Sequence, residues 1–171
     1  DLTDALLSIK DTLSSIERMS LKQQLFDPIN ISPAFSEKRK YAISQRYGIP
    51  GEKIGDDVES VLTLEQVGKQ LGVTRERVRQ LQARTERAIR YNKFWMPKLQ
   101  ELFCILDNNL PISEDNLTTY LVDNDYGYFT IKSLQKISEL YQIEFPFAVK
   151  TIKRKKFLTS EALLELKEIS A

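Results

Sequence analysis

The stretch that decides the fold covers residues 62–90 and reads LTLEQVGKQLGVTRERVRQLQARTERAIR. Thr63, followed three residues later by Gln66, has the spacing of a capping box, in which both side chains satisfy free N–H groups at a helix start. Gly72 adopts without steric cost the left-handed conformation that ends a helix, and Thr74 is a typical cap for the next helix. The pattern therefore predicts two helices joined by a sharp turn.

Apolar residues at helical spacing predict which faces of these two helices pack together. The positions expected to face the core are Val67, Leu71, Val73, Val78 and Leu81. Gly68 has no side chain, so the second helix can pass close above it. This arrangement of apolar residues and glycines predicts a helix-turn-helix.

The outward face of the second helix has residue types that suit the major groove of DNA. When Val78, Leu81 and Thr85 face inward at 100° per residue, the opposite face presents Glu76, Arg79, Gln80, Ala83 and Arg87, flanked by Arg75, Arg77 and Arg84. Arg can bind guanine through two hydrogen bonds, Gln can pair with adenine, Glu can accept from cytosine, and Ala can contact a thymine methyl. We predict base contacts from Arg75, Glu76, Arg79, Gln80 and Ala83. The alternative is a solvated helix with incidental charge.

This stretch resembles the C-terminal promoter-recognition region of bacterial vegetative sigma factors, which reads the −35 element. The resemblance covers residues 36–93, because SEKRKYAISQRYGI at 36–49 is similar to the preceding helix of that region, and VGKQLGVTRERVRQ at 67–80 is its most specific part. It implies that Arg75, Glu76, Arg79 and Gln80 contact bases. The backbone contacts expected here, with Arg87 included as part of the basic flank, are Lys38, Arg46, Thr63, Leu64, Glu65, Arg77, Arg84 and Arg87. Since that family region docks on the flap of the RNA polymerase β subunit, polymerase is an expected partner besides double-stranded DNA.

The sequence also departs from this family. The loop after Gly48-Ile49 is longer, Gln82 stands where the family has Glu, and the chain runs on long after the helix. Nothing resembles the aromatic-rich segment with which sigma factors melt the −10 element. We therefore interpret the chain, which begins at Asp1, as a fragment of a longer protein and not as a complete sigma factor.

Composition limits the function classes. The chain has 171 residues, 42% of them hydrophobic, and its 25 Lys and Arg nearly balance 24 Asp and Glu, for a net charge of +1. A nucleic-acid surface must therefore come from local clustering. With no histidine and one cysteine, the chain lacks the usual ligands of a zinc site and the base of most hydrolases, so we predict no enzyme, metal or cofactor. Cys104 is expected to be a small core residue.

The same composition indicates a location. No disulfide pair, membrane-length apolar run or signal peptide is visible, which indicates a reducing cytoplasm.

We divide the chain into three parts: 1–30 (an amphipathic helix and linker), 31–97 (the helix-turn-helix domain) and 98–171 (a second module). The fold class is mostly α.

The sequence of the N-terminal segment predicts a helix over residues 1–26, which ends at Asp27-Pro28. Its apolar stripe, at spacings of four and three, is Leu2, Leu6, Ile9, Leu13 and Ile16. This helix either lies on the domain or contacts a partner, which includes a second copy in a homodimer. Both interpretations remain open from the sequence.

The sequence of the second module predicts three helices, then a hairpin and a last helix that Ser160 caps. This order of elements resembles a winged helix. The hairpin is IEFPFAVKTIKRKKFLTS at 143–160, and its basic turn includes Lys153 and Arg154, which we predict to contact phosphates. The alternative is that these charges only prevent edge pairing. Phe94 and Trp95 are expected to join the two halves. The segment TIKSLQKISEL at 130–140 offers Lys132, Gln135 and Lys136, either as a second DNA-reading helix or as a protein-contact surface.

Together these features predict sequence-specific binding of double-stranded DNA in transcription initiation or its regulation. The alternative is an interaction adaptor that docks on RNA polymerase or another partner, with DNA binding secondary.

Overall fold

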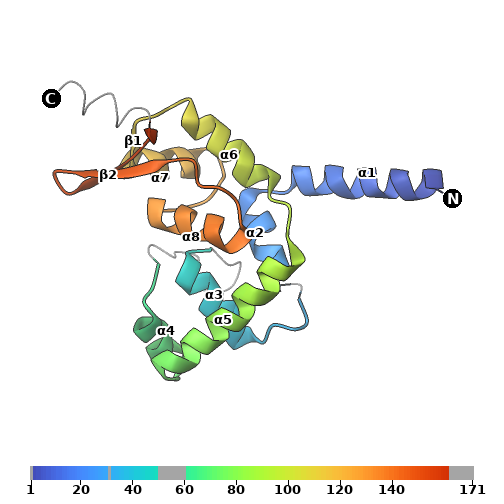
Figure 1. Ribbon diagram of the computed structural model, residues 1–171, viewed down its shortest axis with the longest axis horizontal. Helices are drawn as coiled ribbons and strands as arrows, with labels where there is room; N and C mark the ends of the chain where they lie inside the picture. Colours follow the sequence, from blue (N-terminus) through green and yellow to red (C-terminus); the bar gives the residue numbers. More distant parts are fainter. Residues whose placement is uncertain (1, 31, 50–60, 162–171) are drawn as a thin grey trace.

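The structure is a computed structural model and describes residues 2–30, 32–49 and 61–161 (Figure 1). Its helices are α1 (Leu2–Arg18), α2 (Leu21–Asn30), α3 (Glu37–Tyr47), α4 (Leu64–Leu71), α5 (Arg75–Asn92), α6 (Pro97–Asp107), α7 (Glu114–Asp123) and α8 (Ile131–Tyr141). Its strands are β1 (Ile112–Ser113), β2 (Ala148–Ile152) and β3 (Lys155–Thr159). The mostly helical fold class is confirmed. The predicted loop at 50–60 and the helix after Ser160 lie outside the described residues.

Local sequence signals set most helix ends. The hydroxyls of Thr63, Thr74 and Ser113 cap α4, α5 and α7, and Thr63 forms the predicted capping box with Gln66. Gly48 ends α3 in the left-handed region at a φ of 67°. Each cap satisfies backbone groups that the helix cannot pair internally.

The prediction of one helix over residues 1–26 is wrong. The chain breaks after Arg18, because Ser20 begins a new helix: its hydroxyl accepts a hydrogen bond from the Gln23 backbone N–H at 3.2 Å, and the Gln23 side chain accepts one from the Ser20 N–H at 3.0 Å. Pro28 lies inside α2 and does not end it. A proline removes one helical hydrogen bond, and α2 ends two residues later.

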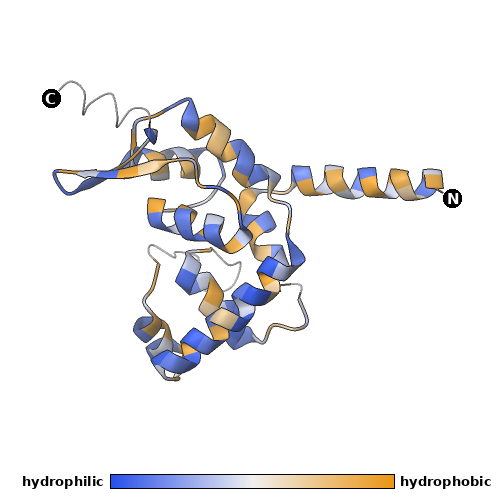
Figure 2. Cartoon of the chain, in the orientation of Figure 1, coloured by the Kyte–Doolittle hydropathy of each residue, from blue (hydrophilic) through white to orange (hydrophobic). Residues whose placement is uncertain are grey.

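Helix α1 projects from the body of the molecule (Figures 1 and 2). It buries none of its residues, so the interpretation that it lies on the domain is wrong. Leu2, Leu6, Ile9 and Leu13 remain between 44% and 75% exposed. The apolar stripe is therefore open from Leu2 to Leu13, whereas its last member, Ile16, is partly buried.

A large core joins the three predicted segments. Its fully buried members include Leu25 and Ile29 from α2, Ile43 and Ile49 from the α3 region, Ile89 from α5, and Leu102, Leu134 and Ile137 from the second module. The predicted boundaries near residues 30 and 97 therefore do not separate independent cores. The division into domains remains a prediction.

The second module forms an antiparallel sheet of strand order β1-β3-β2 beside α6, α7 and α8. The predicted hairpin is present as β2 and β3. Strand β1 was not predicted, because two residues are too short to show an alternating pattern. The order α6, β1, α7, α8, β2, β3 agrees with the winged-helix-like arrangement.

One expectation near the centre of the chain needs correction. Cys104 is exposed, so its placement in the core is wrong. It follows Phe103 in α6 and points away from the buried stripe that Phe103 belongs to.

The connection after α5 contains the two aromatic residues predicted to join the halves. Phe94 meets Tyr141 of α8 edge-on, with ring centroids 6.4 Å apart. Trp95 remains 41% exposed and lines an apolar pocket with Pro28 and Pro33. Phe94 thus packs between the halves, whereas Trp95 lies at the surface beside the N-terminal segment.

Candidate nucleic-acid interface

The turn between α4 and α5 depends on two glycines. A Cβ at Gly68 would lie 2.7 Å from the carbonyl oxygen of Val73, so only glycine allows this close approach. Gly72 has a φ of 64°, in the left-handed region. The Thr74 hydroxyl then accepts a hydrogen bond from the Arg77 backbone N–H at 3.2 Å and starts α5. The predicted turn chemistry is confirmed.

A small core lies beneath this turn. It consists of Ala42, Val67, Val78 and Leu81. Thr85, one turn further along α5, is fully buried; its hydroxyl donates to the Leu81 carbonyl at 2.8 Å and accepts from Arg39 Nε at 3.2 Å. These contacts hold α5 against α3 and α4, and they fix which side of α5 faces outward.

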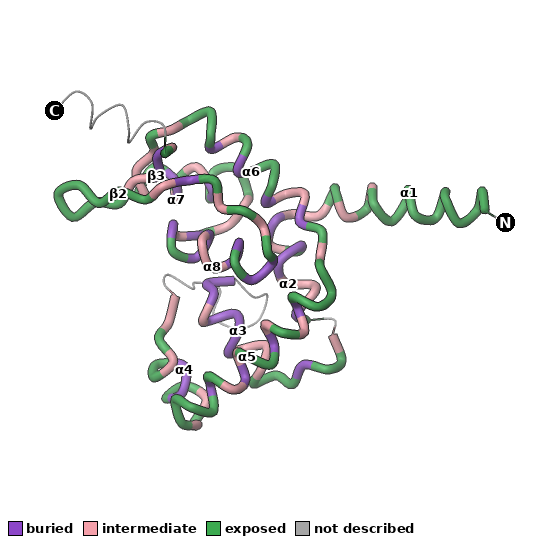
Figure 3. The backbone as a smooth tube through the Cα atoms, viewed as in Figure 1, coloured by how far each residue is buried: buried purple, intermediate pink, exposed green. Residues whose placement is uncertain are grey.

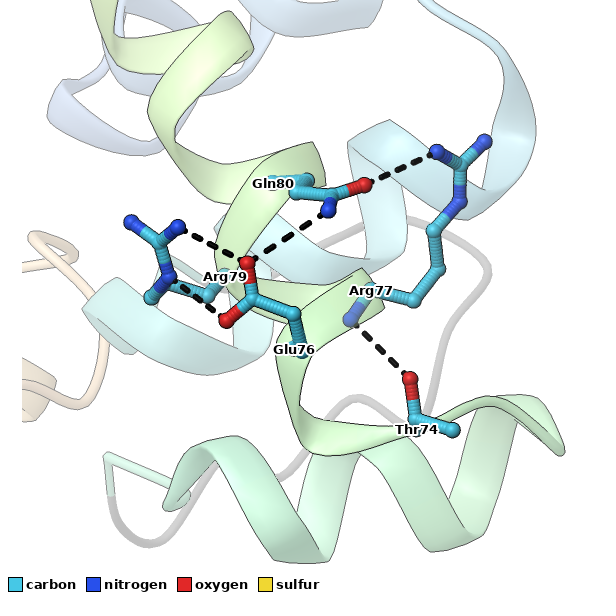
Figure 4. A network of polar contacts seen from close by, with 5 residues as sticks. All are labelled: Thr74, Glu76, Arg77, Arg79 and Gln80. Atoms are coloured by element: carbon cyan, nitrogen blue, oxygen red, sulfur yellow. Dashed lines mark hydrogen bonds and ion pairs between the residues drawn. The ribbon is translucent and has the colours of Figure 1, made fainter.

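The outward side carries a connected set of polar groups (Figure 4). Arg79 donates two hydrogen bonds of 2.8 Å to the Glu76 carboxylate, and both side chains are more than half exposed. Gln80 donates to Glu76 at 3.4 Å, and Arg77 donates to the Gln80 oxygen at 3.3 Å. The Arg79 hydrogen bonds lower the pKa of Glu76, and the Glu76 carboxylate raises the pKa of Arg79. Four of the predicted residues therefore stand side by side as charged or amide groups.

Most of the remaining predicted residues are exposed. Those with exposed side chains are Lys38 on α3, Thr63 and Glu65 at the start of α4, Arg75, Ala83, Arg84 and Arg87 on α5, and Lys153 and Arg154 between β2 and β3. Leu64 is half-buried and packs against the small core. Except for the hairpin pair, these residues lie on α3, α4 and α5.

Arg46 differs from the other predicted residues because its guanidinium forms hydrogen bonds within the fold. It donates to the Gln82 side-chain oxygen at 2.9 Å and to the Leu62 carbonyl. Burial lowers its pKa. The structure therefore gives Arg46 a role in fixing α3 to α5, and its predicted phosphate contact stays untested.

Comparison with known proteins agrees with this geometry. Residues 36–90 match the family model of sigma-70 region 4. We refer to residues 36–90 as region 4 because of this match. The RNA polymerase sigma factor RpoD of two Helicobacter pylori strains is 35% identical to the chain over 83 residues, which is 48% of this chain. The chain spans 11% of the length of these relatives. No solved structure matches.

The matched family is a DNA-binding region of transcription proteins and is not enzymatic. The predicted resemblance over residues 36–93 is confirmed. Within the part of the chain that the structure describes, no helix is both long and apolar enough to cross a bilayer.

Sequence reasoning missed a polar network inside region 4, between α3 and α5. The Tyr47 hydroxyl donates to the Glu86 carboxylate, and Gln82 donates to the same carboxylate at 2.6 Å. Burial, followed by the hydrogen bond to Glu86, raises the pKa of Tyr47. Gln82, noted as a departure from the family, thus bridges Arg46 and Glu86. No periodicity in the sequence links residues 39 positions apart.

Helix α8 packs on the rear of region 4, against α3 and α5. Lys136 donates to the Arg46 carbonyl at 3.4 Å and lies 5.5 Å from the centre of the Tyr47 ring. Figure 3 shows α3 and α8 largely buried where they meet. Lys136 therefore takes part in an internal contact with region 4, whereas Lys132 is exposed. Both roles left open for this helix remain predictions.

Proposed function

We propose that this chain binds double-stranded DNA in a sequence-specific manner, with α5 in the major groove, in transcription initiation or its regulation. The observation that supports this most strongly is the hydrogen-bonded set of exposed Glu76 and Arg79 with half-buried Gln80. These residues lie on a helix that Thr74 and the small core hold in place. Such side chains discriminate bases by paired donors and acceptors.

The contacts divide by role. Arg75, Glu76, Arg79, Gln80 and Ala83 meet base edges in this proposal. The N–H groups at the starts of α4 and α5, together with the basic flanks of α5, bind phosphates and set the register of the helix. Base contacts specify the sequence, and phosphate contacts supply affinity that depends on salt.

Selection from a random pool of duplex DNA tests this function. A recovered consensus is expected, and Arg79→Ala should weaken binding to it by about 1–3 kcal/mol and relax preference at one base pair. Lys10→Ala, which removes an exposed cation from the projecting α1, is the control and should leave the preference unchanged. Unchanged binding of Arg79→Ala to the selected site would contradict the groove assignment.

A second candidate is an adaptor that docks on RNA polymerase, for instance on the flap of its β subunit. The observation in its favour is that the relatives sharing region 4 are RNA polymerase sigma factors. If the chain is such an adaptor, the DNA selection should enrich no sequence, and the chain should capture purified polymerase core enzyme. Failure to bind the core enzyme would exclude it.

We also propose that α1 pairs with α1 of a second copy. Its apolar stripe at spacings of four and three remains exposed, which is the pattern of a helix that packs against another helix. Sedimentation should show a dimer that Leu6→Gln with Leu13→Gln converts to a monomer. A wild-type monomer at high concentration would disprove the pairing.

A further inference from the structure

The hairpin of the second module extends beyond its sheet as a two-stranded ribbon. Strand β1 pairs with Phe157 and Leu158 of β3, and among the described residues no third strand pairs with the ribbon from 151 to 156. Every residue from 149 to 156 is exposed. Isolated two-stranded ribbons are marginally stable in water, so this one is suited to a role at the surface rather than in packing.

The ribbon is densely cationic. Its basic residues are Lys150, Lys153, Arg154, Lys155 and Lys156. Lys155 forms an exposed ion pair with Asp115 of α7 at 3.3 Å. Among the described residues, no hydrogen bond or ion pair holds the side chains of the other four. These cations are therefore available to an anionic partner.

The two residues at the tip occupy an unfavourable backbone conformation. Lys153 and Arg154 have φ values of 47° and 68°, and the register pairs Ile152 with Lys155 on either side of them. A two-residue turn of this kind favours Asn-Gly, and other L-residues in the left-handed region cost roughly 1–2 kcal/mol each. Two long cations stand where the backbone favours small residues, and such strain typically occurs at functional positions.

The hairpin is also held in a defined position relative to α5. It directly follows α8, and α8 packs on α3 and α5 through buried residues and the Lys136 contacts. Along the long axis of the molecule, horizontal in Figure 1, the hairpin tip and α4 both lie away from the projecting α1. In Figure 1 the hairpin lies at the upper end of this side and α4 at the lower end, so the proposed contact requires a duplex that extends beyond α5 along this side of the molecule.

We propose that the hairpin tip binds the phosphodiester backbone of the DNA that flanks the site read by α5, without base preference. The proposal rests on the proposed function, because both contacts use one duplex. Duplex DNA carries one negative charge per about 1.7 Å of axis, so phosphates are available in any flanking sequence. Once α5 is bound, the second contact forms within the complex at a high effective concentration.

The test replaces the tip by Lys153→Asn with Arg154→Gly, which removes two charges and installs the residues that this turn prefers. Binding is measured against salt on two duplexes, one of the selected site alone and one with long flanks. On the flanked duplex, the slope of log affinity against log salt should become flatter by about 1.8. Raising the salt from about 50 to 200 mM should therefore weaken wild type about tenfold more than the variant.

The matched control is Lys10→Ala with Arg18→Ala, which removes the same charge from α1. It should leave the salt slope on both duplexes unchanged, and the hairpin variant should equal wild type on the short duplex. The proposal would be overturned if wild type and the hairpin variant had equal salt slopes on the flanked duplex. It would also be overturned if the α1 control flattened the slope as much as the hairpin variant, or if the hairpin variant flattened it equally on both duplexes. If Arg79→Ala still relaxes base preference in that case, only the hairpin contact fails; if it does not, the proposed function fails.

Discussion

The two glycines of the region 4 turn are required for different physical reasons. Gly68→Ala places a Cβ 2.7 Å from the Val73 carbonyl oxygen, and this backbone atom cannot move without shifting α5. Gly72→Ala meets no atom within 4 Å and is strained only by its φ of 64°. We expect Gly68→Ala to cost roughly 2–3 kcal/mol of unfolding free energy and Gly72→Ala about 1 kcal/mol, both measured by urea denaturation. A larger loss from Gly72→Ala would contradict the close approach.

Glu76 limits how strongly Arg79 attracts any phosphate. The two-hydrogen-bond pair offsets the charge of Arg79 and orients its guanidinium on the surface of α5. Glu76→Gln should therefore increase affinity for a scrambled duplex several-fold while it reduces the ratio of selected-site to scrambled-site affinity. Glu139→Gln on α8, an exposed carboxylate outside the α5 surface, is the matched control. If Glu76→Gln and Glu139→Gln changed the ratio of selected-site to scrambled-site affinity equally, the role assigned to Glu76 would be wrong.

At the scale of elements, Tyr47 links α3 to α5 and α8. Its buried phenol donates to Glu86 and lies beneath Lys136, so Tyr47→Phe should cost about 1.5–3 kcal/mol near neutral pH. Because the fold raises the pKa of this phenol above its ordinary value of 10.0, the fold favours the neutral form. The stabilisation is complete below pH 10 and is lost as the pH rises above it.

The measurement is the difference in unfolding free energy between wild type and Tyr47→Phe from pH 8 to 11. The difference isolates Tyr47, since the other groups, including the buried Tyr141, titrate in both proteins. The cost of the substitution should shrink above pH 10. A cost independent of pH would show that the phenol is not held neutral by the fold.

Local patterns predicted the elements that depend on neighbours in the sequence. The apolar period and caps located α3, α4, α6, α7 and α8, and the hairpin followed from its β-branched residues and basic turn. The start of α2 was missed although Ser20 and Gln23 have capping spacing, because the end of the apolar stripe at Ile16 was not interpreted as the end of a helix. The projection of α1 and the contact of α8 with region 4 depend on tertiary packing, which no local period reports.

For the whole molecule, the two cores explain why region 4 is joined to a second module. The small core under the turn contains four buried residues, too few to stabilise a domain alone. The rear of region 4 presents Ile43, Ile49 and Ile89, and these are buried in the large core together with residues of α6 and α8. The second module therefore stabilises the helix-turn-helix that it follows, in addition to any contact of its own with DNA.

This dependence predicts one cooperative unfolding transition. Leu134 of α8 is fully buried in the shared core, so Leu134→Ala should cost about 2–5 kcal/mol. Hydrogen exchange at the amides of Val78 in α5 and Leu121 in α7 should lose protection by the same amount, because both depend on global unfolding. Cys104→Ser, at an exposed position on α6, is the control and should leave both amides unchanged. If Leu134→Ala reduced protection at Leu121 alone, region 4 would be stable on its own, and the boundary near residue 97 would separate two independent domains.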